Sequence, residues 1–258
     1  MGNLIKYEWR KQRMTRILIL ACLLAFVVLF VAGAVLRNDT LVAVSILIMT
    51  FAGMFGILYV GIENIVILNR DLKTKQSYML WMVPHSTYEI LASKIIAGIL
   101  QMAFVFMAFF IAGAATLTIT AASDGSLGEF LRAVREFFER GVNIQVDWGL
   151  VFGMCLLCLI AWMNVMVVGF LAVILTRTVL LNTKFGGVIA FGGVIAVILF
   201  FVINFVIDRI YIILGQLFDL APISGWGGIG LFDYVFYIVM TVLVYLLVGW
   251  IADRKLSI

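Results

Sequence analysis

A short polar segment between two long apolar runs holds most of the side chains in this chain that could do chemistry. Residues 69–88 combine several cations with a histidine and several aromatic rings, a mixture that suits contact with another protein better than catalysis. The candidate contact residues are Arg70, Asp71, Lys73, Lys75, Tyr78, Trp81, His85 and Tyr88. The alternative interpretation is an ordinary solvated turn.

The patterns that would indicate catalysis or metal binding are missing from the sequence. His85 is the single histidine, and no carboxylate cluster lies beside it, so we expect no metal site and no catalytic residue. Cys155 and Cys158 lie inside an apolar run, where cysteine acts first as a small apolar residue. The chain has no Gly-x-x-x-x-Gly-Lys-Ser/Thr loop, so we expect it to bind no ATP in that manner and not to be an enzyme by itself.

Six apolar runs must position these residues, in a chain that is 65% hydrophobic and 12% charged. Each run is long enough to cross a hydrocarbon core of about 30 Å as a helix, and none shows the alternation of a barrel strand. Backbone groups in lipid must bond to one another, so the predicted fold is all-α, one polytopic domain over residues 1–258. The predicted spans are 17–36, 41–68, 89–119, 148–175, 185–207 and 235–252.

The distribution of cations predicts the orientation of these spans. Thirteen of the 18 Lys and Arg residues lie in the segments that share a side with the amino end, and five lie in the others. The positive-inside rule therefore places both termini in the cytoplasm of a cell with this protein in its plasma membrane. This topology accounts for the net charge of +4, which gives no support for nucleic-acid binding.

Two segments near the cytoplasmic side have predictable local structure. Residues 4–11 mix apolar and aromatic side chains with cations, as in a helix that lies in the membrane interface, although a plain basic flank is the alternative. Pro84, Ser86 and Glu89 form a pattern that breaks the chain and then caps a helix, so the third helix should begin near Thr87.

Two segments on the opposite side are less regular. Residues 127–140 predict an amphipathic helix that rests on the outer leaflet, covers the external mouth of the protein or binds substrate. Residues 208–234 are apolar but interrupted by Pro222 and several glycines, which favours a re-entrant segment before the last span over a hydrophobic surface loop.

Few polar residues lie within the spans, and Glu63, Asn64, Asn164 and Asn204 are more typical of helix–helix contacts than of a transport site. Aromatic and Met side chains on the second and fifth spans offer an adaptable apolar surface, and facing lipid or neighbouring helices is the alternative. The candidate pathway residues are Met49, Phe51, Met54, Phe55, Tyr59, Phe200, Phe201 and Asn204.

The chain resembles the permease subunit of bacterial ATP-binding cassette (ABC) exporters with six spans. The resemblance rests on the six-span layout and on the order Arg70-Asp71-Leu72-Lys73-Thr74-Lys75-Gln76-Ser77-Tyr78, Val83-Pro84-His85-Ser86 and Leu91-Ala92-Ser93-Lys94. Within that family it is most similar in style to Gram-positive exporters of phenol-soluble modulins and antimicrobial peptides. The helix predicted at 127–140 is not a standard feature of the family.

The resemblance implies a homodimer that binds two copies of a separate ATPase subunit, which holds ATP and Mg²⁺. Residues 69–88 would form the coupling segment that contacts this ATPase, and amphipathic peptides would be the cargo. Lipids or lipophilic drugs are the next cargo classes. An ion-coupled secondary transporter is the competing function, but that class predicts buried acids or paired broken helices, and the sequence shows neither clearly.

Overall fold

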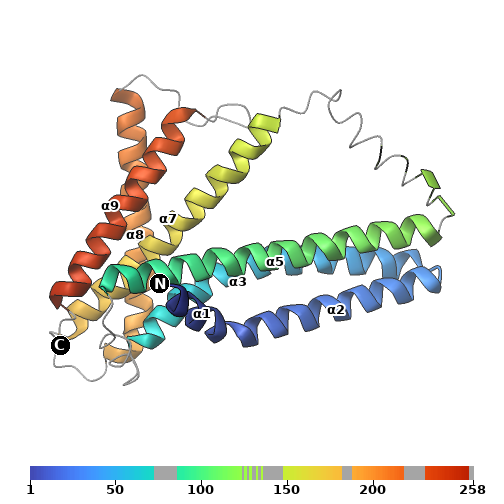
Figure 1. The fold of residues 1–258 in the computed structure, drawn as a ribbon, viewed down its shortest axis with the longest axis horizontal. Coiled ribbons are helices and arrows are strands. Elements are labelled where there is room, and N and C mark those ends of the chain that lie inside the picture. Colours follow the sequence, from blue (N-terminus) through green and yellow to red (C-terminus); the bar gives the residue numbers. More distant parts are fainter. Residues whose placement is uncertain are drawn as a thin grey trace. The chain divides into compact units, whose positions relative to one another are not determined.

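The computed structural model describes residues 1–72, 86–123, 148–181, 188–217 and 230–255, together with residues 125, 126, 128, 129, 132 and 135. The described residues form helices, and the all-α class predicted from the sequence is confirmed. Six helices are long and apolar enough to span a membrane, so the chain is a multi-pass membrane protein (Figure 1).

The helix bounds follow the apolar runs closely. A short helix precedes the spans, and each observed span extends beyond its predicted core at one or both ends. The helices are α1 (Gly2–Lys11), α2 (Arg13–Val35), α3 (Asp39–Asp71), α5 (Thr87–Ser123), α7 (Trp148–Leu181), α8 (Val188–Leu217) and α9 (Leu231–Lys255).

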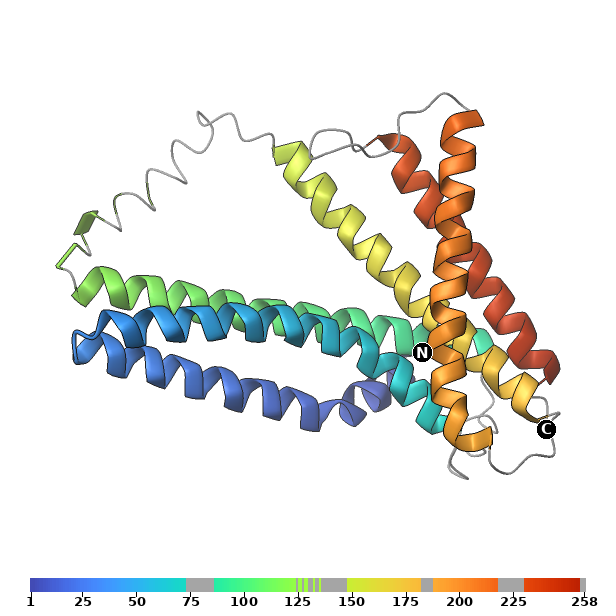
Figure 2. The same ribbon diagram turned by 180° about the vertical axis from the view of Figure 1, so that it is seen from behind.

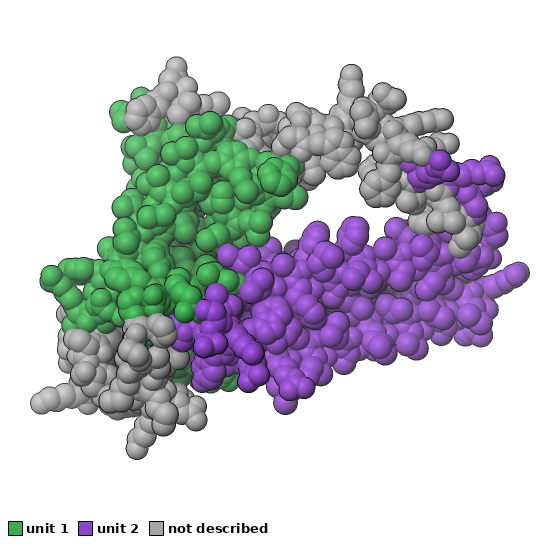
Figure 3. Space-filling view, viewed as in Figure 1, with its two compact units in different colours: residues 1, 61–96, 152–258 green, residues 2–60, 97–151 purple. Residues whose placement is uncertain are grey.

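The helices divide between two compact units (Figure 3). Unit 1 contains residues 61–96 and 152–258 together with Met1, and unit 2 contains residues 2–60 and 97–151. The helices α3 and α5 contribute residues to both.

In unit 2, α2 runs beside α3 and α5 in both views of the ribbon (Figures 1 and 2). The turn from α2 to α3 places Arg37 at φ 51°, a left-handed conformation that is uncommon outside glycine. The Asn38 side chain then accepts a hydrogen bond of 3.2 Å from the Leu41 amide and caps α3. A hairpin of two spans thus needs only a three-residue connection.

A small core holds unit 2 together where these helices meet. Its buried members are Ile19, Val60 and Val105, and the half-buried side chains packed on them are Ile57, Met102, Phe104 and Phe109. Gly53 allows the α3 backbone to approach the Phe109 ring, because a Cβ atom at this glycine would lie 3.2 Å from the ring.

In unit 1, α7 is the most covered span. In its most apolar stretch 56% of the residues are buried, whereas the value is 6% in α3 and in α8. Two glycines bring α7 close to the inner part of α3. A Cβ atom at Gly61 would overlap the Trp162 ring, and one at Gly169 would overlap the Ile65 side chain.

Two asparagines on these helices make the contacts expected of residues that join helices. The Asn164 amide donates to the Thr241 hydroxyl at 3.2 Å and joins α7 to α9. The Asn64 amide lies 3.9 Å from the Met166 sulfur, where it donates a weak hydrogen bond between α3 and α7. Both side chains are buried, so these contacts satisfy polar groups that lipid could not.

Two of the predicted segments are described by the structure only in part. Of the helix predicted at 127–140, the structure describes four residues, all of them helical, and the rest lies outside the described residues. Residues 208–217, the first part of the predicted re-entrant segment, continue α8 as helix. The apolar run Ile210–Leu214 sustains the helix, and the first breaker, Pro222, comes only after α8 has ended. Residues 218–229 lie outside the described residues.

Candidate functional site

The two ends of the polar segment at 69–88 are fixed to helices of unit 1. Ser86 caps α5, since its hydroxyl accepts a hydrogen bond of 3.3 Å from the Glu89 amide and its carbonyl accepts one of 3.2 Å from Ile90. The helix therefore begins at Thr87, which confirms the start predicted from the capping pattern.

An ion pair joins the last turn of α3 to α5. The Lys94 ammonium lies 2.5 Å from the Asp71 carboxylate, and the two side chains are only 2% and 12% exposed. A charge pair held this far from water is screened little, and it connects the helices on either side of the segment. Asp71, one of the predicted contact residues, is thus turned into the protein, because a buried ammonium lies within its reach.

A second contact holds the same end of α3. The Arg177 guanidinium of α7 donates a hydrogen bond of 2.8 Å to the Asn69 side-chain oxygen. Together with the Asp71–Lys94 pair, this bond ties the end of α3 to two different helices.

Tyr88 connects the first turn of α5 with the last turns of α9. The Tyr245 hydroxyl donates a hydrogen bond of 2.6 Å to the Tyr88 carbonyl, and the two ring centroids are 5.9 Å apart. Gly249 lies against the Tyr88 ring so closely that a Cβ atom there would overlap it. The Thr87 hydroxyl also donates a hydrogen bond to the Asp253 carboxylate.

We call these contacts the inner cluster. Its members come from α3, α5, α7 and α9 and are Asn69, Asp71, Thr87, Tyr88, Lys94, Arg177, Tyr245, Gly249 and Asp253. The cluster has no activated nucleophile, and the described residues hold no group of three or more metal ligands. The cluster joins these helices through short polar contacts and one tight contact between an aromatic ring and a glycine.

Of the contact residues predicted from the sequence, three are described. Arg70 is exposed, Asp71 is paired with Lys94, and Tyr88 is half-buried against α9. Lys73, Lys75, Tyr78, Trp81 and His85 lie outside the described residues, so their role stays a prediction.

Sequence reasoning missed most of the inner cluster. Lys94 gave the clearest signal, because a cation two turns into an apolar helix needs a partner. Its charge was considered only for the orientation of the spans. Gly249 and Tyr245 gave no signal, because glycines and tyrosines are common in membrane helices.

The opposite end of α9 has its own contacts, which we call the outer latch. The Asp233 carboxylate accepts a hydrogen bond of 2.8 Å from the Gly230 amide and one of 2.5 Å from the Tyr211 hydroxyl of α8. Asp233 is buried, and the Tyr211 ring packs on Phe236 with the centroids 5.1 Å apart. The carboxylate therefore caps α9 and binds α8 at once.

The candidate pathway residues fall on both units. On α3, four of the five are exposed, namely Phe51, Met54, Phe55 and Tyr59, whereas Met49 is half-buried. On α8, Phe201 is 66% exposed and stacks edge-on with Phe200. Asn204 donates to the Phe200 carbonyl of its own helix at 2.8 Å, so it does not join two helices through this bond.

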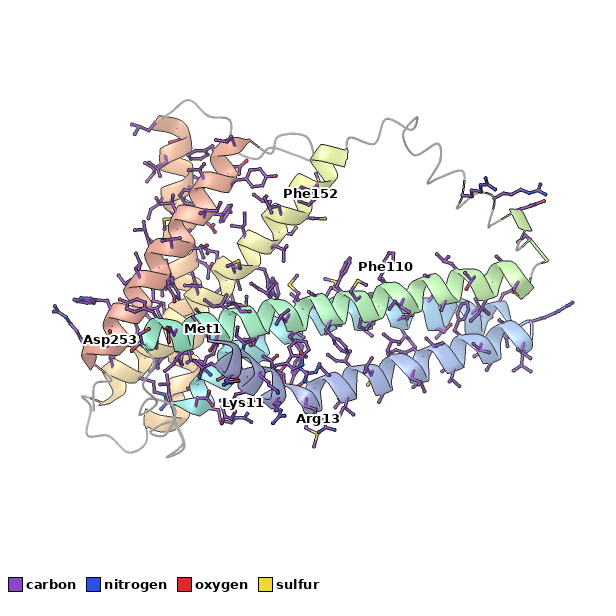
Figure 4. All side chains as sticks on the ribbon, in the orientation of Figure 1. Met1, Lys11, Arg13, Phe110, Phe152 and Asp253 are labelled. Carbon is purple, nitrogen blue, oxygen red and sulfur yellow. The ribbon has the colours of Figure 1, made fainter. Side chains whose placement is uncertain are left out.

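Many other apolar side chains are exposed on the spans, as expected of helices that meet lipid. Phe110 on α5 and Phe152 on α7 are 64% and 71% exposed (Figure 4). Exposure alone therefore does not distinguish a pathway from a lipid-facing surface.

Comparisons with known proteins found no relatives. No model of a known protein family matches the chain, and no curated protein and no solved structure matches it either.

Proposed function

We propose that this chain is the permease subunit of an ABC exporter that moves amphipathic peptides out of a bacterial cell. In this proposal two copies of the chain bind two copies of a separate ATPase subunit, which holds ATP and Mg²⁺. Both termini lie in the cytoplasm and residues 69–88 form the coupling segment. The observation that carries the proposal is the inner cluster, which fixes both ends of that segment to long membrane helices.

Coupling requires that a movement at the ATPase reach the spans without being lost on the way. A segment attached only through its own backbone would transmit such movement poorly. The Asp71–Lys94 pair fixes one end and the contacts of Tyr88 with α9 fix the other, so a displacement of the segment displaces α3, α5 and α9. Packed helices respond to such forces as rigid bodies.

A pathway at a twofold interface would be lined by spans that the rest of the chain leaves uncovered. The second and fifth spans were selected from the sequence for this role, and α3 and α8 are the spans least covered by the rest of the chain. A single copy has few helices with which to enclose a large substrate, and a twofold dimer is the commonest assembly. A pathway there would be lined by Phe, Met and aliphatic side chains, which suit amphipathic cargo.

The first experiment tests the coupling segment. The chain is co-expressed with the product of its neighbouring gene, and the purified membrane fraction is assayed for a co-purifying ATPase. A Lys73→Glu, Lys75→Glu variant should lose this ATPase or its substrate-stimulated hydrolysis, because the contact surface changes sign. The matched control is Arg132→Glu, Arg135→Glu, which reverses the same number of charges on the predicted external side.

The proposal fails if no ATPase co-purifies with the wild-type chain. It also fails if the two double variants keep equal amounts of this ATPase and equal substrate-stimulated hydrolysis. Transport that runs on an ion gradient in vesicles without any ATPase would instead identify a secondary transporter.

The second experiment tests the pathway and the cargo. In a background with Cys22, Cys155 and Cys158 replaced by Ser, single cysteines along 46–60 or 188–204 should cross-link two copies of the chain. Vesicles that hold the permease with its ATPase should respond to amphipathic helical peptides. Stimulation by lipids or lipophilic drugs alone would overturn the peptide assignment and retain the exporter.

A further inference from the structure

The exposed face of α1 and of its junction with α2 carries three cations. Lys6, Arg10 and Arg13 are all exposed. Lys6 and Arg10 are four residues apart and lie on one side of α1, and Arg13 is the first residue of α2. Glu8 is the single acid of this stretch, and it is buried and paired with Lys11 at 3.3 Å. Among the described residues, no carboxylate forms an ion pair with Lys6, Arg10 or Arg13.

The other face of α1 is fixed within unit 2. The Trp9 ring packs edge-on against Phe104 of α5 with the centroids 6.3 Å apart, and the Arg16 guanidinium lies 4.0 Å above the Trp9 ring. Arg16 also donates hydrogen bonds of 2.9 Å to the Gln101 side chain and 2.8 Å to the Trp9 carbonyl. These contacts set the orientation of α1, and Arg13 lies on the side turned away from α5 (Figure 4).

The apolar residues that follow fix the depth of the three cations. Ile17, one turn after Arg13 on the same side of α2, is 50% exposed, and its neighbour Leu18 is 63% exposed. These side chains begin the span and belong in hydrocarbon. One helical turn is about 5.4 Å long, so the guanidinium of Arg13 lies at the level of the lipid headgroups.

We propose that Lys6, Arg10 and Arg13 form a binding surface for the phosphate groups of anionic lipids. Charge complementarity selects an anionic partner, and the depth of the surface selects a lipid over a soluble protein. Each Lys or Arg near an anionic leaflet strengthens the attraction of a segment to that leaflet by about fivefold. Three such residues together strengthen it on the order of a hundredfold.

The test uses the purified full-length chain in a neutral detergent. Phosphatidylglycerol, phosphatidylcholine and soluble glycerol phosphate are titrated separately, and the bound molecules are counted by native mass spectrometry. The wild-type chain should bind phosphatidylglycerol in preference to the other two, and this binding should weaken as salt is added. A variant with Lys6→Gln, Arg10→Gln and Arg13→Gln should lose this preference for phosphatidylglycerol.

Two further variants separate this surface from general charge effects. Arg37→Gln, Arg132→Gln, Arg209→Gln removes the same number of exposed cations elsewhere and should bind phosphatidylglycerol like the wild type. Arg10→Lys, Arg13→Lys keeps the charge and should also retain binding. The topology of each variant is checked by protease protection, and a variant with an inverted topology is replaced by the corresponding single substitutions.

Four results would overturn the proposal. These are unchanged binding in the first triple variant, equal losses in both triple variants, equal binding of phosphatidylcholine, and equal binding of glycerol phosphate. Loss of a co-purifying ATPase with unchanged lipid binding would assign the surface to a protein partner instead.

Discussion

The two ends of α9 are held in different ways. The outer latch joins α9 to α8, its neighbour in the chain, through a buried carboxylate that also caps the helix. The inner cluster joins α9 to the start of α5, more than 150 residues away in sequence, through a ring that lies on a glycine and a bond from Tyr245 to the Tyr88 carbonyl. The outer contacts stabilise a hairpin of consecutive helices, whereas the inner contacts connect α9 with the end of the polar segment at 69–88.

If this difference reflects different roles, changes in the outer latch should lower stability and leave the coupling of ATP hydrolysis to transport intact. Changes at Tyr88 and Gly249 should impair that coupling more than they lower stability. The ion pair of the inner cluster should affect both, because its charges are buried.

The largest effect is expected from Lys94→Met. This change removes the cation that lies against the mostly buried Asp71 carboxylate, and breaking a buried pair from one side costs about 3 kcal/mol or more. The measurement is thermal unfolding of the purified protein in detergent. The double variant Asp71→Asn, Lys94→Met should recover most of the loss, and equal unfolding temperatures for single and double variants would contradict a buried pair.

Asp233→Ala should come next, with a loss of about 2–3 kcal/mol, because two hydrogen bonds to a buried carboxylate disappear. Tyr211→Phe removes one of them and should cost less. The same unfolding assay applies, followed by ATPase measurements on the complex with its partner. A loss of substrate-stimulated hydrolysis in protein that remains folded would place the outer latch in coupling as well.

Gly249→Ala should cost about 1–3 kcal/mol, since the added Cβ atom forces the Tyr88 ring to move. Its effect on coupling should exceed its effect on unfolding temperature. Gly113→Ala is the matched control, because a Cβ atom at that position of α5 meets nothing within 4 Å. Comparable transport rates in the two variants would show that the contact between Tyr88 and Gly249 is not used.

Tyr245→Phe should have the smallest effect, a loss of about 1 kcal/mol, because it removes one hydrogen bond and keeps the ring. Transport driven by ATP should fall modestly while the protein remains assembled. Hydrogen exchange at the first turn of α5 gives the most direct reading, and unchanged exchange there would remove the Tyr245 bond from the inner cluster.

The helices themselves were predictable from the sequence, because lipid leaves the backbone few alternatives. The start of α5 was predictable to the residue, since Ser86 and Glu89 form a local signal. The helix α8 continues ten residues beyond the predicted end of the fifth span, because an apolar run follows the polar pair Asp208-Arg209.

The inner cluster could not be predicted, since its contacts join residues on different helices. Nothing near Gly249 in the sequence indicates that Tyr88 will lie against it. The partner of Lys94 is 23 residues away, across the segment that was predicted to contact another protein. Helix positions follow from local composition, whereas contacts between helices depend on how the helices are rotated about their axes.

The packing of α3 on α7 has a consequence for the synthesis of the protein. Asn64 contacts Met166, which lies 102 residues later in the chain. At about 5–20 residues per second, the ribosome produces this partner roughly 5–20 seconds after it has made Asn64. During that interval Asn64 and the glycine surface at Gly61 have no α7 to pack against. Until α7 is made, this part of α3 lacks the helix that covers it in the folded protein, and slow translation before α7 should increase degradation of the unfinished protein.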